Sequence, residues 1–163
     1  MESFKNVNAS SYETLEWIVE HSDSGFFALI ASEPMQSHVI QRFKRFNVAI
    51  CDYRLYPGEY KFSTLEDWIA DQPDKDAYFL LNFQRSLSGE SAVKRLNFSR
   101  DMLARLNKNI IFCMTQDADN LLNREAYDLY SYIKIVVVFQ DEEPDCVSAN
   151  PKETSSGSFA VFK

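Results

Sequence analysis

The stretch that decides the fold is Phe26-Phe-Ala-Leu-Ile-Ala-Ser-Glu-Pro34, in which an apolar run passes directly into a helix start. A continuous apolar run of this length suits a strand that is covered on both faces. The serine, acid and proline that follow are residues that open helices. This segment therefore predicts a buried strand that leads straight into an α-helix.

Four further apolar runs repeat this arrangement along the chain. They are Val48–Cys51, Ala77–Leu81, Asn109–Cys113 and Ile133–Phe139. Between them lie stretches with apolar residues at helical spacing, and another such stretch, at about residues 10–22, precedes the first strand. Strands that alternate with helices form parallel sheets with helices on both faces. The sequence predicts a three-layer, doubly wound α/β fold with five mostly parallel strands.

Local patterns also predict where the helices begin and end. Ser10-Ser-Tyr-Glu13 and Ser63-Thr-Leu-Glu66 match capping boxes, in which the first serine precedes the helix. The stretch 88–106 and the stretch 116–131 each predict one uninterrupted helix. Gly25 is expected to end the first helix because glycine readily adopts a left-handed conformation.

The length of 163 residues, with 45% hydrophobic residues, indicates one domain with a sizeable core. Residues 1–139 are expected to form that single α/β domain. Residues 140–163 are expected to form an acidic and polar tail, because the strand pattern gives way to acidic residues, Pro, Asn, Ser and Gly. The segment Phe159-Ala-Val-Phe162 in this tail predicts an added edge strand or a docking segment.

The charge balance restricts the classes of partner. A net charge of −7 argues against broad binding to nucleic acids or anionic membranes. No apolar run approaches the roughly 20 residues that span a bilayer, and the first 25 residues lack the pattern of a signal peptide. We therefore expect a cytoplasmic protein without a membrane partner, and a nucleic-acid partner is disfavoured.

The cysteines and histidines exclude several chemistries. Three cysteines at wide spacing do not form a disulfide framework, and Cys51 and Cys113 lie in apolar runs that predict buried thiols. His21 and His38 have no metal-ligand spacing to each other or to a cysteine. We therefore expect no metal site, no Cys-His pair and no catalytic residue of these kinds.

A nucleotide is the obvious ligand for such a fold, and the sequence argues against it. The first strand is followed by Ala31-Ser-Glu-Pro-Met-Gln36, which contains no glycine and no lysine to hold phosphates. The third strand ends in Asn82 and Gln84, where a nucleotide hydrolase would carry an acid for Mg²⁺. The sequence predicts no nucleotide cofactor and no ATPase activity.

The linear pattern nevertheless resembles the P-loop ATPase modules of bacterial signalling and STAND-like proteins over about residues 25–139. The resemblance lies in six segments, namely Gly25–Ala31, Tyr78–Phe83, Leu96–Asp101, Leu103–Leu106, Ile110–Met114 and Asp128–Tyr132. In that family a Gly-Lys loop binds the nucleotide, and this chain departs from the family at that loop. The resemblance therefore implies a degenerate NTPase-like scaffold, P-loop-like or Rossmann-like, with a role in bacterial signalling or defence.

Two groups of residues are candidates for function. Polar residues at the carboxyl ends of the strands are candidates for ligand binding, because ligands of doubly wound sheets bind there; these are Ser32, Asp52, Asn82, Gln84 and Arg85. An aromatic-rich loop is a candidate for protein contacts; its residues are Tyr53, Arg54, Tyr56, Tyr60 and Phe62. The same aromatics could instead fold back over the sheet edge.

The polar group Asn97, Arg100 and Asp101 is interpreted as a solvated helix face, with a network aimed at the strand ends as the alternative. Taken together, these observations favour a non-catalytic interaction or regulatory module. It would act through a protein partner, which could be a second copy in a homodimer. One alternative is a small-ligand-binding or hydrolytic enzyme that uses the strand-end residues. Another is an acidic inhibitor of a nucleic-acid-binding protein that uses Asp141 to Asp145.

Overall fold

Five parallel strands form one sheet in the order β2-β3-β4-β1-β5. The strands are β1 (Gly25–Ile30), β2 (Val48–Asp52), β3 (Ala77–Leu81), β4 (Asn109–Met114) and β5 (Ile133–Val138). The computed structural model describes residues 7–55, 62–72 and 74–141. This strand order differs from both the 3-2-1-4-5-6 order of dinucleotide-binding Rossmann folds and the 2-1-3-4-5 order of flavodoxin-like folds. The predicted three-layer α/β class is confirmed.

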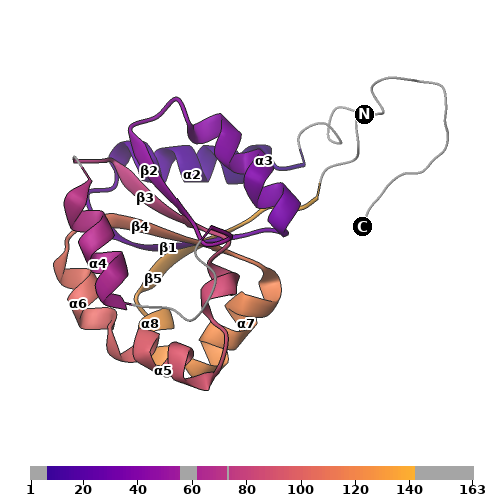
Figure 1. Cartoon of the computed structure of the whole chain (residues 1–163). Helices are drawn as coiled ribbons and strands as arrows, with labels where there is room; N and C mark the ends of the chain where they lie inside the picture. Colours follow the sequence, from indigo (N-terminus) through magenta and orange to yellow (C-terminus); the bar gives the residue numbers. More distant parts are fainter. Residues whose placement is uncertain (1–6, 56–61, 73, 142–163) are drawn as a thin grey trace, which may run out of the picture.

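The helices of the described residues alternate with these strands. They are α2 (Ala9–His21), α3 (Glu33–Phe43), α4 (Phe62–Asp71), the 3₁₀ turn η1 (Phe83–Ser86), α5 (Glu90–Phe98), α6 (Arg100–Arg105), α7 (Gln116–Glu125) and α8 (Tyr127–Tyr130). Figure 1 shows α2 and α3 on one side of the sheet and α4 to α8 on the other.

The direction of each crossover explains this division. The chain passes from β1 across the sheet to β2 at one edge, and then returns through β3 and β4 before it reaches β5 at the other edge. Right-handed crossovers that run in opposite directions place their helices on opposite faces. For this reason α3 lies on one face and every later crossover helix lies on the other.

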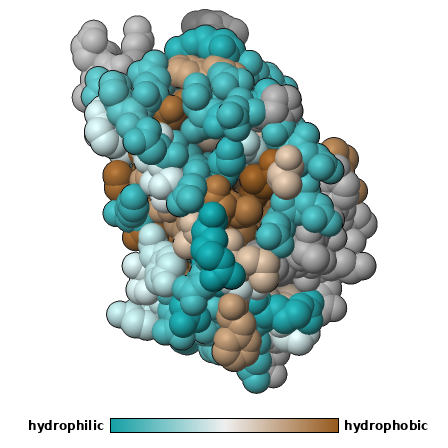
Figure 2. All heavy atoms as spheres, turned by 90° about the vertical axis from the view of Figure 1, so that its left-hand side faces the viewer, coloured by the Kyte–Doolittle hydropathy of each residue, from teal (hydrophilic) through white to brown (hydrophobic). Residues whose placement is uncertain are grey.

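Alternate strand residues build the two halves of the core. Phe27, Leu29 and Phe79 pack towards α2 and α3, whereas Phe26, Tyr78 and Phe112 pack towards α4 to α8. Figure 2 looks onto the amino ends of the strands and shows apolar side chains gathered between two hydrophilic regions, as expected for a sheet seen between two helical layers. Burial on both faces explains why the inner strands are continuous apolar runs.

Each of the two long helices that the sequence predicts is divided into two in the structure. The stretch 88–106 is broken at Ser99, whose hydroxyl donates to the carbonyl of Arg95 at 2.6 Å. The stretch 116–131 is broken at Ala126, and the free backbone N–H of Leu129 in α8 donates to the side chain of Asn97 in α5 at 2.9 Å. A cap supplied from another helix leaves no signal in the local sequence.

The two predicted capping boxes are wrong. Ser10 lies inside α2, whose N-cap is Asn8, and Ser63 lies inside α4. Asn8 is fixed by a distant part of the chain, because its side-chain amide bonds the backbone of Gln140. Gly25 does not end the first helix but opens β1, with a φ of 148° that side chains rarely adopt. A Cβ atom there would lie 3.0 Å from the Lys134 side chain.

None of the helices among the described residues has the length and apolar character needed to cross a bilayer.

We predict that Phe112→Ala lowers the free energy of unfolding by about 3–5 kcal/mol, the usual cost of removing a buried Phe side chain. Phe112 is fully buried, and its ring lies 5.7 Å from that of Phe26 and 5.0 Å from that of Phe83, between centroids. Urea unfolding measures the change. Phe98→Ala is the matched control, since the Phe98 side chain is 78% exposed. Equal losses in the two variants would contradict the packing described here.

Candidate functional site

The topology of the sheet marks one place as the natural site for a ligand. β1 and β4 are neighbours, but the connection after β1 leads to α3 on one face and the connection after β4 leads to α7 on the other. Such divergence opens a crevice at the carboxyl ends of the two strands. We call the polar side chains gathered at the carboxyl ends of β1, β2 and β3 the strand-end network, defined by Glu33, Gln36, Asp52, Arg54, Asn82, Gln84 and Arg85.

The first turn of α3 contributes an acid to this network. Ser32 caps the helix by accepting a hydrogen bond from the Met35 backbone N–H at 3.3 Å. Glu33 and Pro34 follow in the first turn. A carboxylate is favoured there by the free N–H groups of the helix start. The same position would attract the phosphate of a ligand.

Glu33 is held by the turn that follows β3. Arg85 donates to both carboxylate oxygens, from Nε to Oε2 at 2.7 Å and from Nη2 to Oε1 at 2.8 Å. Gln84 donates from Nε2 to Oε2 of Glu33 at 2.6 Å. The acid after β1 is therefore bound by residues that follow β3, although β4 lies between these two strands.

Gln36 lies beneath this pair and is only 1% exposed. Its Nε2 donates to the Ala31 carbonyl at 3.1 Å and to Oε1 of Gln84 at 3.3 Å. Its Oε1 accepts from the backbone N–H of Asn82 at 2.8 Å. One amide side chain thus satisfies backbone groups at the ends of β1 and β3, and it leaves neither of its own polar atoms without a partner.

Asn82 ends β3 in a left-handed conformation with φ 58°. Asparagine adopts this conformation more readily than other residues with a side chain, apart from Asp and His. The buried side chain of Asn82 donates to Oδ1 of Asp52 at 3.1 Å and accepts from Gln84 at 3.3 Å. The turn after β3 is therefore joined to the end of β2.

Asp52 closes the network at its outer end. Arg54 donates to this carboxylate from its backbone N–H at 3.0 Å and from Nη2 at 2.7 Å. Each arginine of the network thus pairs with a carboxylate of the network, Arg54 with Asp52 and Arg85 with Glu33. Polar groups that already bind one another offer little to an incoming ligand.

The pKa values of the two carboxyls reflect these partners. The pKa of Glu33 lies below its ordinary value, chiefly because Arg85 donates to its charged form. Burial acts to raise the pKa of Asp52, but the hydrogen bonds from Arg54 and Asn82 outweigh it and the pKa is lowered. Both groups are therefore carboxylates at neutral pH.

The polar tail begins beside this site. The hydroxyl of Ser32 donates to Oδ1 of Asp141 at 2.7 Å, so Asp141 lies next to the first turn of α3. The protein places a second carboxylate of its own where a helix start would attract an anionic ligand.

The structure brings most of the predicted ligand-binding residues together in the strand-end network. Asp52, Asn82, Gln84 and Arg85 meet in the strand-end network, and Ser32 lies beside it as the cap of α3. Gln36 was missed by sequence reasoning. Its position one turn into α3 leaves no motif, and only the end of β3 shows what it binds.

The predicted contact loop needs a correction at Tyr53. This ring is 8% exposed and packs edge-on against Phe83 at 5.2 Å, so it belongs to the core and does not provide a contact surface. Arg54 is held by Asp52. Tyr56, Tyr60 and the side chain of Phe62 lie outside the described residues.

The group Asn97, Arg100 and Asp101 does not face the strand ends. Asn97 caps α8, Arg100 lies 3.8 Å from Asp128, and Asp101 accepts from the Tyr132 hydroxyl at 2.8 Å. The alternative of a network aimed at the ligand crevice is therefore wrong. These residues join α5 and α6 to the α8 region.

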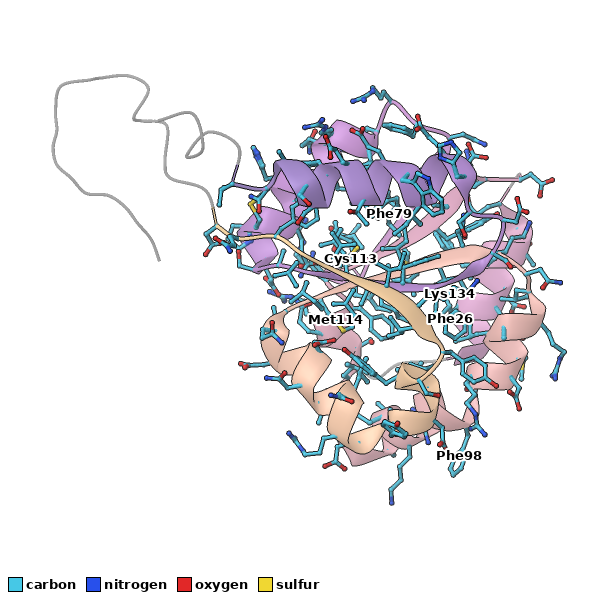
Figure 3. The ribbon with its side chains drawn as sticks, turned by 180° about the vertical axis from the view of Figure 1, so that it is seen from behind. Phe26, Phe79, Phe98, Cys113, Met114 and Lys134 are labelled. Atoms are coloured by element: carbon cyan, nitrogen blue, oxygen red, sulfur yellow. The ribbon has the colours of Figure 1, made fainter. Side chains whose placement is uncertain are left out.

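Four exposed large apolar side chains on and near α5, α6 and α8 also escaped sequence reasoning. We call this region the α5–α8 surface, and its apolar members are Phe98, Met102, Tyr127 and Tyr132. Figure 3 shows Phe98 projecting away from the body of the protein. The helical spacing that marks buried residues cannot reveal which large side chains remain outside.

Other sites for chemistry are weak among the described residues. No group of three or more His, Cys, Asp or Glu side chains in this part of the chain could hold a metal ion. Cys51 and Cys113 are buried as predicted, and burial raises the pKa of the Cys51 thiol to about 11, so it is no nucleophile at neutral pH. A pocket of about 370 Å³ is lined by Leu87, Gly89, Val93, Lys94, Leu121 and Glu125, none of which belongs to the network.

No protein-family model matches this sequence, and a search of curated proteins finds no match either.

We predict that Gln36→Leu lowers the free energy of unfolding by about 1–3 kcal/mol for each buried backbone group it leaves unpaired. Two such groups are the Asn82 N–H and the Ala31 carbonyl. Urea unfolding of the variant gives the value. Gln41→Leu, at an exposed position of the same helix, is the control and should change stability by less than about 0.5 kcal/mol. A Gln36 variant as stable as the control would refute this role.

Because the pKa of Glu33 is lowered in the folded protein, we predict that part of the free energy of unfolding is lost in acid. A carboxyl whose folded pKa lies below its unfolded value of 4.5 stabilises the fold fully above that pH. This contribution is lost as the pH falls through the lower folded pKa. Wild type and Glu33→Gln should therefore differ in unfolding free energy at neutral pH and converge in acid, as urea unfolding over a pH series would show. A gap that persists in acid would contradict the assignment.

Proposed function

We propose that this chain is a non-catalytic protein-interaction or regulatory module on a degenerate NTPase-like scaffold. The observation that carries the proposal is the Glu33 carboxylate in the first turn of α3, bound by Arg85 and Gln84. A nucleotide-binding relative of this scaffold would need that helix start for phosphate. Here Arg85 and Gln84 already donate to the carboxylate at that helix start.

The charged side chains at the strand ends also disfavour nucleotide binding. The strand ends carry the carboxylates of Glu33, Asp52 and Asp141 against the guanidinium groups of Arg54 and Arg85. A triphosphate would have to displace a bidentate ion pair and would then meet the released carboxylate. Breaking charge-assisted hydrogen bonds and adding like charge both oppose binding.

The α5–α8 surface is the face that we assign to a protein partner. Phe98 and Tyr127 are 78% and 64% exposed, and Met102 and Tyr132 lie on the same group of joined elements. Arg100 adds a guanidinium beside them. Aromatic side chains, methionine and arginine are the residues that dominate protein–protein contacts. This surface replaces the Tyr53 region as the best-supported contact face.

A small-ligand site at the strand ends is the second candidate function. The left-handed Asn82 at the centre of the network favours it, because strained backbone collects at functional sites. Such a site would use Ser32, Asp52, Asn82 and Arg85. Its chemistry would be binding, since among the described residues no histidine or reactive thiol lies in the network.

We expect no turnover of Mg-ATP or Mg-GTP by the purified protein, and no binding of either nucleotide by titration calorimetry in the micromolar range. The physical reason is that Glu33 and Arg85 already form an ion pair with each other. Gln84→Ala and Arg85→Ala serve as controls for site-specific binding. Micromolar binding by wild type that either variant abolishes would overturn the non-catalytic proposal.

The contact face is tested by comparative purification from the native cell. We expect wild type to retain a partner that the double variant Phe98→Ser, Tyr127→Ser loses, since both side chains are exposed and their removal leaves the core intact. Trp17→Ser, an exposed aromatic change on α2 in the other helical layer, is the matched control. A partner that is retained by the double variant but lost by the control would move the interface to the α2 face.

A further inference from the structure

The outer side of β5 offers unpaired backbone groups. The Phe139 N–H donates to the Ile30 carbonyl of β1 at 2.8 Å, so the backbone groups of the odd residues 135, 137 and 139 face β1. The N–H and C=O groups of one residue point to the same side in a parallel pair. Those of Val136 and Val138 therefore point away from the sheet, along its edge.

Two side chains of the α2 region pair with the far end of this edge. The hydroxyl of Ser11 donates to the Val138 carbonyl at 2.6 Å. Asn8 exchanges two hydrogen bonds of 2.9 Å with the backbone of Gln140, as a neighbouring strand would. Among the described residues, no hydrogen bond reaches the outward N–H or C=O group of Val136. The edge is thus closed at one end and open in its middle.

The side chains along the open part are apolar and exposed. Val136 and Val138 are 40% and 48% exposed, and they pair in register with Ala28 and Ile30, on the α7 and α8 side of the sheet. The intervening Val137 is buried on the α2 side. Figure 3 shows β5 in front, with helices above and below it and Lys134 near its start. Proteins usually protect such an edge, because unpaired β-branched strands recruit further strands.

The last residues of the sequence contain a run that suits this edge. Between Asp141 and Phe159 lie 17 residues, most of them polar or acidic, and Phe159-Ala-Val-Phe162 follows them. A chain of that length can extend over about 55–60 Å, whereas a strand of six residues covers about 20 Å. The run can therefore return alongside β5 in the antiparallel direction.

We propose that Phe159–Phe162 pairs antiparallel with β5 and adds a sixth strand to the sheet. With Val161 opposite Val136, the two residues exchange both backbone hydrogen bonds. Opposite residues point to the same face, so Val161 covers Val136 and Phe159 covers Val138. This register uses the open groups of Val136 and covers both exposed valines.

A segment of the same chain is a better occupant than a second copy. Only 17 residues separate the run from Asp141, which gives the run a high effective concentration beside the edge, whereas two chains of net charge −7 repel each other. A symmetric pairing of two β5 strands about Val136 would also set Lys134 against Val138, whose carbonyl Ser11 already occupies. The tail run meets this occupied carbonyl once, at Phe159, whereas a symmetric pair of β5 strands would meet it on both chains.

Amide hydrogen exchange of the full chain, followed by NMR, tests the pairing. We expect the Val136 amide to be protected in wild type and to exchange about tenfold faster or more in Val161→Pro, because proline cannot donate to the Val136 carbonyl. The amides of Ile135 and Val137, which face β1, should keep their rates in both proteins. Ser155→Pro, in the polar linker, is the matched control and should leave Val136 protected.

Three results would overturn the proposal. The first is an unprotected Val136 amide in wild type. The second is equal protection in wild type and Val161→Pro, which would exclude the segment as the occupant. The third is protection that rises with protein concentration together with a dimer in sedimentation, which would assign the edge to a second copy.

Discussion

The ion pair between Glu33 and Arg85 is the interaction on which the carboxyl end of the sheet depends. The two residues follow β1 and β3, which are separated by β4, so their pairing ties together two connections that the sheet itself does not join. The buried side chain of Gln36 links the same two strand ends. Its Nε2 donates to the Ala31 carbonyl after β1, and its Oε1 accepts from the Asn82 N–H after β3. Buried polar groups are costly when unpaired, so the members of such a network hold one another in place.

This arrangement has a consequence for function. The divergence of the connections after β1 and β4 would make the same crevice a ligand site in other doubly wound sheets, but here the Glu33 carboxylate after β1 is bound by Arg85 and Gln84. Surfaces away from the crevice remain available. The α5–α8 surface presents aromatic side chains to solvent. These features are the basis of our proposal that the chain acts in recognition.

The sequence alone predicted the fold well and the site in part. The strands were visible because burial on both faces demands continuous apolar runs, and Ala77–Leu81 was predicted to the residue. Helix ends were less predictable, because Asn8 and Asn97 act through residues far away in the chain. At the strand ends, Asp52, Asn82, Gln84 and Arg85 could be named from their positions, but their partners depend on the strand order. For Tyr53 the sequence left two readings open, a contact surface or packing back on the sheet edge, and the buried ring follows the second.

The most direct measurement of the central claim is the NMR signal of the Arg85 Nε–H during a titration with Mg-ATP. If Glu33 holds this guanidinium as the structure shows, the signal should be shifted and slow to exchange, and it should not move when nucleotide is added. It should lose these properties in Glu33→Gln. A signal that shifts and saturates with Mg-ATP, or one that is the same with and without the Glu33 carboxylate, would contradict a closed strand-end network.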